Sequence, residues 1–92
     1  MIVSFKDRSL KRFYDRGDAG GIRPDLRHRI HTILGRLDIS ESIDDLRIHS
    51  FRLHPLKGDR KGFWSITVRA NLRIVFRFND GNVLDVELTD YH

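Results

Sequence analysis

The sequence predicts an α+β fold of two layers, in which an N-terminal strand and two helices pack on a mainly antiparallel sheet of three to five strands. Two observations predict this class. Apolar residues recur at helical spacing between residues 8 and 37, whereas apolar and polar residues alternate from residue 63 onward. The 92 residues contain no cysteine, and a chain of this length can form one modest core without disulfides or a metal. We therefore expect a single domain spanning residues 1–92.

The first 17 residues predict a short strand followed by a helix. Residues 2–5 are mostly apolar and suit a strand. Asp7 is a favourable N-cap for a helix that continues to Arg16, because its carboxylate can accept hydrogen bonds from the first free backbone N–H groups. Gly17 suits the left-handed residue that ends such a helix.

The second helix is expected over Pro24–Leu37, with proline at its first position. Its apolar residues step by three or four and should face the sheet: Ile22, Leu26, Ile30, Ile33 and Leu37. The remaining charged and polar residues are expected to form a solvated outer face: Arg23, Arg27, His28, Arg29, His31 and Arg36. Ser42 resembles the first residue of a capping box that opens one further turn.

The stretch Phe63–Phe78 predicts a β-hairpin with one apolar and one basic face. The expected core residues are Trp64, Ile66, Val68, Leu72, Ile74, Phe76 and Phe78. These rows share a face if Val68 lies opposite Leu72 and Trp64 opposite Phe76. This register requires a three-residue loop over residues 69–71, with Asn71 in the left-handed conformation. The opposite face would carry Ser65, Thr67, Arg69, Asn71, Arg73 and Arg77.

Two further strands are expected beside the hairpin. Residues 51–53 suit a strand start, and residues 57–62 form a basic loop that leads into the hairpin. After a turn at residues 79–82, residues 83–89 alternate again. In that last strand Leu84, Val86 and Leu88 should face the core.

The charge distribution favours an anionic partner. The net charge is +4 and the pI is about 10.0, yet residues 52–77 alone carry a net charge of +6. The positive charge is therefore focused on the hairpin and the loop before it. The N-terminus lacks the pattern of a signal peptide and the longest apolar runs are a few residues, so we expect a cytoplasmic protein without a membrane partner.

The chain ends in Asp90-Tyr91-His92, and these residues together with His54 could transfer protons near neutral pH. Lys57 and Arg73 add fixed positive charge. This inventory suits metal-free RNA cleavage, in which the ribose 2′-hydroxyl loses a proton as it attacks phosphorus and the 5′-oxygen gains one. Strand alternation sets a condition: either the strand ends before Asp90, or Tyr91 lies on the face opposite to its two neighbours.

Three separated motifs resemble the HigB toxins of bacterial toxin–antitoxin systems, which belong to the RelE superfamily. They are LHPLKGDR at residues 53–60, WSITVRANLRI at residues 64–74 and DYH at residues 90–92. The resemblance implies a RelE-like fold and a toxin that cuts messenger RNA in the A site of the 70S ribosome by 2′-hydroxyl attack, without metal or other cofactor. It also implies a HigA-type helix-turn-helix antitoxin, through which the toxin reaches operator DNA only indirectly.

The resemblance also implies roles for individual residues. Those assigned to catalysis are His54, Asp90, Tyr91 and His92, and those assigned to phosphate binding are Lys57 and Arg73. Asn71 is a candidate for contact with an RNA base edge, although its place at a hairpin tip is explained more simply by the turn. Two other functions remain open at this point: a gyrase poison of the ParE kind, which shares the superfamily fold, and a non-catalytic nucleic-acid-binding module.

Overall fold

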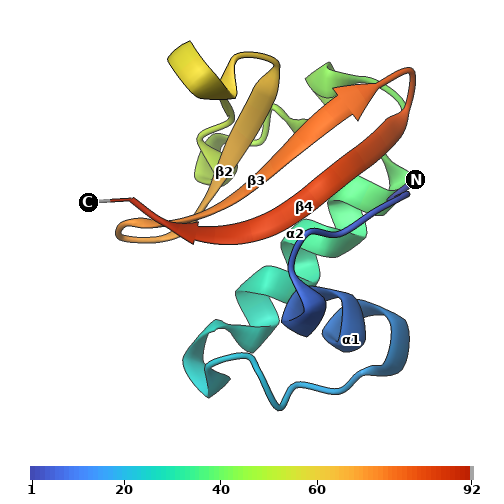
Figure 1. Ribbon diagram of the computed structural model, residues 1–92, viewed down its shortest axis with the longest axis vertical. Helices are drawn as coiled ribbons and strands as arrows, with labels where there is room; N and C mark the ends of the chain where they lie inside the picture. Colours follow the sequence, from blue (N-terminus) through green and yellow to red (C-terminus); the bar gives the residue numbers. More distant parts are fainter. Residues whose placement is uncertain (92) are drawn as a thin grey trace.

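The computed structural model describes residues 1–91 and shows two layers (Figure 1). Helices α1 (Arg8–Arg16) and α2 (Arg27–Ile39) lie against one face of a four-stranded antiparallel sheet. The strands follow the chain order across the sheet: β1 (His54–Pro55), β2 (Phe63–Arg69), β3 (Leu72–Asn79) and β4 (Asn82–Asp90). The predicted α+β class is confirmed.

Short 3₁₀ turns and the N-terminal segment complete the architecture. The turns are η1 (Pro24–Leu26), η2 (Ile43–Leu46), η3 (His49–Phe51) and η4 (Gly58–Arg60). The N-terminal segment is less regular than expected, because it makes only two isolated parallel bridges to β4, from Ile2 to Val83 and from Phe5 to Val86. It therefore covers the outer edge of β4 without forming a continuous strand.

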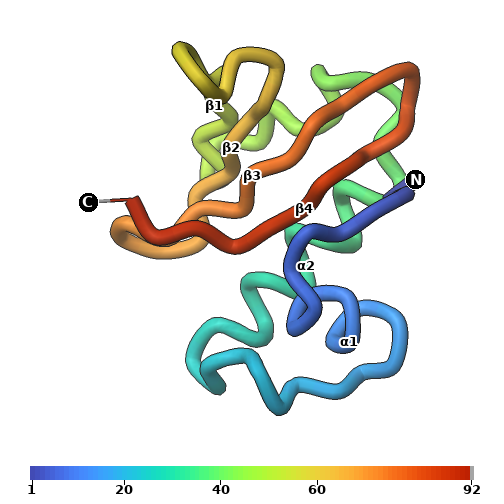
Figure 2. The backbone as a smooth tube through the Cα atoms, viewed as in Figure 1, coloured from blue at the N-terminus to red at the C-terminus, as the bar shows by residue number. Residues whose placement is uncertain are grey.

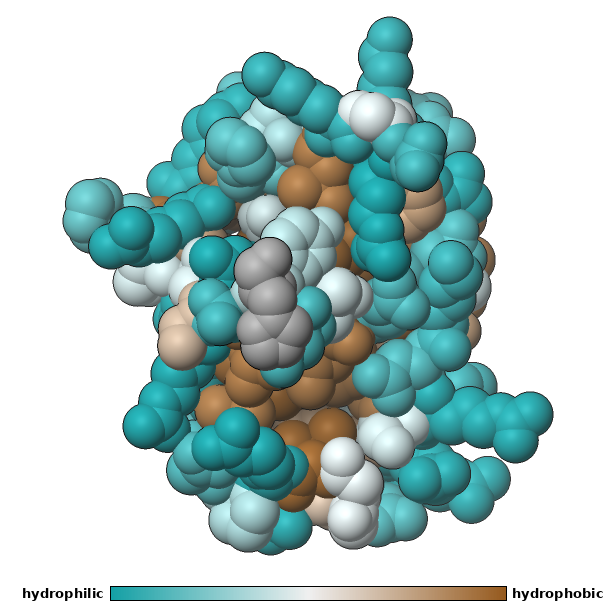
Figure 3. Space-filling model, turned by 60° about the vertical axis from the view of Figure 1, so that its left-hand side comes forward, coloured by the Kyte–Doolittle hydropathy of each residue, from teal (hydrophilic) through white to brown (hydrophobic). Residues whose placement is uncertain are grey.

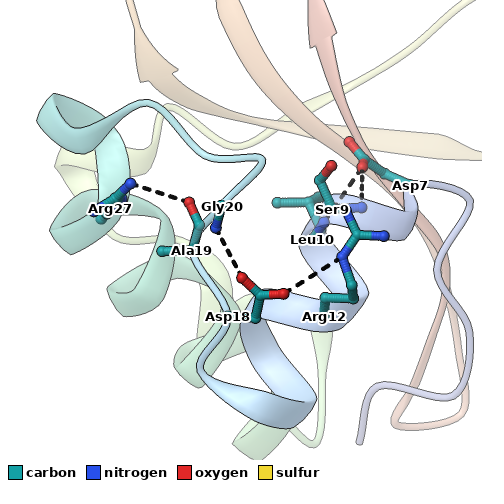
Figure 4. A network of polar contacts seen from close by, with 8 residues as sticks. All are labelled: Asp7, Ser9, Leu10, Arg12, Asp18, Ala19, Gly20 and Arg27. Carbon is teal, nitrogen blue, oxygen red and sulfur yellow. Dashed lines mark hydrogen bonds and ion pairs between the residues drawn. The ribbon is translucent and has the colours of Figure 1, made fainter.

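Helix α1 begins and ends at the residues that the sequence predicts. One carboxylate oxygen of Asp7 accepts hydrogen bonds from the backbone N–H groups of Ser9 and Leu10, at 2.9 and 3.3 Å (Figure 4). Gly17 ends the helix with a φ of 71°, in the left-handed region. The second carboxylate oxygen of Asp7 lies 3.4 Å from the backbone nitrogen of Leu88, so the cap also ties α1 to β4.

Helix α2 packs its apolar face on the sheet, but its opposite face is not uniformly solvated. Pro24 opens η1 as expected, and α2 then continues to Ile39, two residues beyond the predicted end. The expectation of a solvated face is wrong for Arg27 and Arg29, which are half-buried. Arg27 donates to the backbone carbonyl oxygens of Ile22 and Ala19, each at 3.1 Å.

The β2–β3 hairpin keeps the predicted core face but has a different turn. Trp64 lies opposite Phe76, as the sequence predicts. Near the tip Arg69, rather than Val68, pairs with Leu72, because Val68 is an extra residue in a β-bulge. The loop is therefore the two residues 70–71, and Ala70, not Asn71, has a positive φ, of 50°.

A second bulge changes which residues of β4 face the core. Between the pairs Val75–Glu87 and Arg77–Leu84, β4 contains one extra residue. Asp85 adopts a φ of 55° there, and its carboxylate lies 2.8 Å from a guanidinium nitrogen of Arg77. The prediction for Leu84 is wrong, because the bulge turns the fully buried Val83 inward in its place.

The predicted strand start at residues 51–53 is also wrong. Phe51 ends η3 and Arg52 follows with a φ of 49°, so the chain cannot be extended there. Strand β1 is limited to His54 and Pro55, the latter without a backbone N–H to donate to a ladder. The capping box at Ser42 is present and opens η2 as predicted.

Candidate active site

A surface pocket of about 460 Å³ lies on the face of the sheet opposite to the helical layer. Its lining residues come from the segment before β1, from β1 to β3 and from the chain end: Arg52, His54, Leu56, Ser65, Thr67, Arg73 and Tyr91. The chain end reaches this region because β4 brings it beside the β2–β3 turn (Figure 2). We call this set of residues the His54 pocket.

Cross-strand pairing determines which side chains reach the pocket. Thr67 pairs with Arg73, and Arg73 pairs in turn with Thr89, so the three form one row across β2, β3 and β4. Tyr91 follows Thr89 by two residues and therefore lies on the same face. Its backbone N–H donates to the carbonyl oxygen of Asn71 at 2.8 Å, which fastens the chain end to the hairpin tip.

His54 reaches the pocket from its other side. It pairs with Ser65, whose side chain is buried at 4% exposure, while His54 itself is exposed. Arg52 lies two residues earlier, in the left-handed conformation that ends η3. An imidazole and a guanidinium thus approach the pocket from the same short segment.

The described residues of the His54 pocket give it positive charge. Among residues 1–91, its lining includes the guanidinium groups of Arg52 and Arg73 and no carboxylate side chain. Arg73 donates from one guanidinium nitrogen to the carbonyl oxygens of Ala70 and Leu72, which holds its side chain over the hairpin tip. The positive charge of this pocket favours an anionic ligand. Its imidazole and phenol groups are able to exchange protons with that ligand.

A neighbouring pocket of about 280 Å³ differs in charge. Its lining residues are Arg23, Arg69, Ala70, Asn71, Leu72 and Asp90. One carboxylate oxygen of Asp25 lies 2.8 Å from guanidinium nitrogens of both Arg23 and Arg69, and Asp90 adds a second acidic group. Positive charge in this pocket is therefore largely offset, unlike that of the His54 pocket.

The structure brings together only part of the predicted site. His54, Arg73 and Tyr91 line one pocket. Asp90 pairs with Leu72 and lines the neighbouring pocket together with Asn71, so the strand continues through Asp90 and splits the terminal motif between two faces. Lys57 is exposed in the loop before η4 and lines neither pocket, and His92 lies outside the described residues.

Several pocket residues were not candidates from the sequence. Ser65 and Thr67 were predicted on this face of the hairpin but without a role, and Arg52 contributed only to the net charge. For Arg52 the only signal was its place in a strand predicted over residues 51–53, and that strand does not form. Leu56 offered no signal of this kind.

Neither a metal site nor a membrane-spanning helix occurs among the described residues. Residues 1–91 hold no group of three or more His, Cys, Asp or Glu side chains placed to bind a metal ion. No helix in this part of the chain has both the length and the apolar character needed to cross a membrane.

Comparison with known proteins assigns the chain to a family. Residues 3–92 match the family model described as the RelE-like toxin of the type II toxin–antitoxin system HigB. The chain belongs to the HigB-like toxin family. Among its HigB relatives is Endoribonuclease HigB of Proteus vulgaris, 44% identical over 92 residues and covering 100% of both chains. Toxin HigB-1 of Vibrio cholerae serotype O1 is 32% identical over 90 residues, covering 96% of this chain and 95% of the relative.

Solved structures of related toxins share the fold of this HigB-family chain. A YoeB–YefM toxin–antitoxin complex from Staphylococcus aureus matches with a TM-score of 0.65 at 17% identity, covering 100% of this chain and 95% of that chain. YafQ from E. coli matches with a TM-score of 0.64 at 13% identity, covering 98% and 91%. The predicted RelE-like architecture is confirmed by these likenesses.

Proposed function

We propose that the chain is a toxin that cuts messenger RNA in the ribosomal A site and thereby stops translation and growth. The observation that carries the proposal is the His54 pocket, where His54 and Tyr91 share a basic surface with Arg52 and Arg73. The relative named Endoribonuclease HigB, similar over the full length of both chains, supports the same class of reaction.

The proposed reaction is a transesterification. The ribose 2′-oxygen bonds to the neighbouring phosphorus as the bond from phosphorus to the 5′-oxygen breaks, which leaves a 2′,3′-cyclic phosphate and a 5′-hydroxyl. One group must remove the 2′-hydroxyl proton and another must protonate the 5′-oxygen. We assign one of these transfers to His54, since imidazoles exchange protons near neutral pH. Tyr91 would donate a hydrogen bond to the phosphate or stack on a base.

Arginine side chains would stabilise the charge that develops on the phosphate. Arg73 is already oriented by its contacts with the carbonyl oxygens of Ala70 and Leu72, so little reorganisation is needed when the phosphate arrives. Arg52 offers a second guanidinium from the opposite side of the pocket. Exposed Lys57 would bind a phosphate that flanks the cleaved bond.

The other residues of the terminal motif keep a proposed catalytic role. Asp90 would act from the neighbouring pocket, as a base or by orienting an imidazole, and His92 would serve as the alternative proton shuttle to His54. Asn71 lines the same pocket as Asp90 and would contact a base edge there. No metal or other cofactor enters the proposed reaction.

The ribosome would supply the alignment that this small chain lacks. Tyr91 and His54 are the aromatic rings among the residues that line the pocket, so few surfaces are available on which single-stranded bases could stack. Alignment of the reacting groups contributes much of the barrier reduction in such reactions. We therefore propose that the 70S ribosome, with its messenger RNA and ribosomal RNA, is the partner on which cleavage occurs, in the cytoplasm.

A protein antitoxin is the second proposed partner. The family model describes a toxin of a type II toxin–antitoxin system, and the S. aureus YoeB–YefM structure is a toxin–antitoxin complex. We propose a HigA-type antitoxin with a helix-turn-helix fold. Contact with operator DNA would then be indirect, through that antitoxin.

A single atom of the substrate tests the proposed chemistry. Ribosomes are programmed with a message whose A-site codon carries either normal riboses or one 2′-deoxyribose at the position of attack. The proposal predicts cleavage of the first message, with a 2′,3′-cyclic phosphate end, and none at the modified position of the second. Unchanged cleavage at the deoxyribose would exclude 2′-hydroxyl attack, and DNA breaks without RNA cleavage in cells would favour a gyrase poison.

A further inference from the structure

We propose that Arg29 of helix α2 is a positioning residue that fixes the segment carrying Arg52 and His54 against strand β2. Arg29 is not among the residues that line the His54 pocket, and the sequence predicts it on a solvated face. The inference rests on the proposed function, because it concerns the geometry of that same pocket. It adds a residue whose effect on cleavage is indirect.

The guanidinium of Arg29 joins three parts of the chain. Its Nη2 donates to the carbonyl oxygen of Ser50 at 2.6 Å and to that of Thr67 at 2.8 Å. Its Cζ lies 5.2 Å from the centre of the Phe51 ring, within the range of a cation–π contact. One side chain thus connects β2, which contributes Ser65 and Thr67 to the pocket lining, with η3, which directly precedes Arg52.

The segment that carries Arg52 and His54, which we call the catalytic segment, needs such a connection because its own strand pairing is short. The β1–β2 ladder consists of two pairs, His54 with Ser65 and Pro55 with Trp64. If the ladder continued in the same register, Arg52 would lie opposite Thr67, but its φ of 49° interrupts the extended backbone there. Arg29 binds the Thr67 carbonyl at the position where the ladder has stopped.

The conformation of Arg52 makes this connection more important. A residue other than glycine in the left-handed region is strained, and this conformation persists only where the surroundings hold it. Arg52 follows directly on Ser50 and Phe51, the two residues that Arg29 contacts in η3. Loss of Arg29 would therefore allow Arg52 to relax and His54 to move with it.

A lysine cannot replace this arrangement although it keeps the charge. The guanidinium is planar, offers several donors in fixed directions and stacks on aromatic rings, whereas an ammonium group is a compact point charge. Arg29→Lys therefore separates the geometric role of Arg29 from any contribution of its charge to RNA attraction.

Arg27 provides a matched control on the same helix. It also lies half-buried and donates from its guanidinium to two backbone carbonyl oxygens, those of Ile22 and Ala19, each at 3.1 Å. These carbonyls belong to the loop between α1 and η1, where Figure 4 shows the contact with Ala19, and not to the residues that line the His54 pocket. Arg27→Lys should reduce stability to a similar extent without moving the catalytic segment.

The test compares the two variants with the wild-type protein on programmed ribosomes and by NMR. Single-turnover cleavage at saturating toxin should fall about 10- to 100-fold for Arg29→Lys, since small displacements of reacting groups have effects of this size. The toxin concentration for half-maximal cleavage should change little. The imidazole resonances of His54, assigned from the spectrum of His54→Gln, should shift in Arg29→Lys. Arg27→Lys should match the wild type in both readouts.

The outcomes separate the inference from the proposed function. Equal cleavage losses in the two lysine variants, with an unmoved His54 resonance, would reduce Arg29 to a general stabilising residue and overturn the inference. If the wild-type protein itself fails to cleave on the ribosome, the proposed function is wrong, and the NMR comparison still decides whether Arg29 positions His54.

Discussion

Replacement of Arg73 by alanine should nearly abolish cleavage while leaving the protein folded. Arg73 is one of two guanidinium groups that residues 1–91 contribute to the His54 pocket, and none of these residues contributes a carboxylate side chain there. Loss of one preorganised donor to a developing oxyanion typically reduces the rate by about 10²- to 10³-fold, or about 3–4 kcal/mol of transition-state stabilisation. The contacts with Ala70 and Leu72 contribute about 1 kcal/mol to folding, so the unfolding midpoint should fall by about 4–8 °C.

The assay is single-turnover cleavage on programmed ribosomes at 25 °C, where the variant remains folded. Arg36→Ala is the matched control, because it removes the same charge from an exposed residue in the last turn of α2. Charges separated by more than about 10 Å are largely screened at moderate salt, so the control should retain nearly all activity. Equal losses in the two variants would refute the reasoning and indicate general electrostatic attraction.

Three further predictions concern the chain end, the first helix and acid stability. Tyr91→Phe keeps the ring but should lower the cleavage rate by about 100-fold with an unchanged unfolding midpoint, because it removes the hydroxyl that would donate a hydrogen bond to the phosphate. Full activity in rate measurements would contradict that role. Asp7→Ala should reduce the free energy of unfolding by about 1–2 kcal/mol in denaturant titrations, and Asp7→Asn by much less, because asparagine retains the N-cap. The hydrogen bond from the Ile2 backbone N–H lowers the pKa of Asp38 below its ordinary value. The contribution of ionised Asp38 to the free energy of unfolding should therefore be complete above about pH 4 and lost as the pH falls through the lowered pKa. The difference in this free energy between wild type and Asp38→Asn should shrink in acid. A difference that stays constant down to pH 2 would contradict this linkage.

The elements that sequence reasoning predicted are those specified by local signals. Asp7 and Gly17 define both ends of α1 through cap chemistry that acts over a few residues. The core face of the hairpin follows from strict alternation, and the pair Trp64–Phe76 is where that alternation places it. Such signals determine type and approximate bounds of an element without reference to the rest of the fold.

The errors occur where one residue departs from the regular backbone. Ala70, Asp85 and Arg52 adopt positive φ values, which no local preference predicts for alanine or arginine. Each departure changes which side chains face the core and which face the opposite side of the sheet. The bulge at Asp85 exchanges Leu84 for Val83, and the turn at Arg52 shortens β1 to two residues.

The sequence named candidate residues for the site but not how they are grouped in space. Motif resemblance named His54, Arg73 and Tyr91 as candidates, and the fold places them in one pocket. It gave no indication that Arg29 connects η3 to β2, since a helical arginine in a charged stretch has the same sequence pattern whether it is solvated or half-buried. Tertiary contacts of this kind require the structure.

Cleavage with and without the ribosome tests the central claim most directly. One messenger RNA is incubated with the purified protein alone, with vacant ribosomes, and with ribosomes that present an empty A site over a defined codon. We expect rapid cutting within that codon in the third sample and very slow cutting in the first two, because the His54 pocket, as proposed, would bind phosphate without aligning single-stranded bases. Equal cleavage in all three samples would identify a self-sufficient ribonuclease and contradict the ribosome-dependent mechanism.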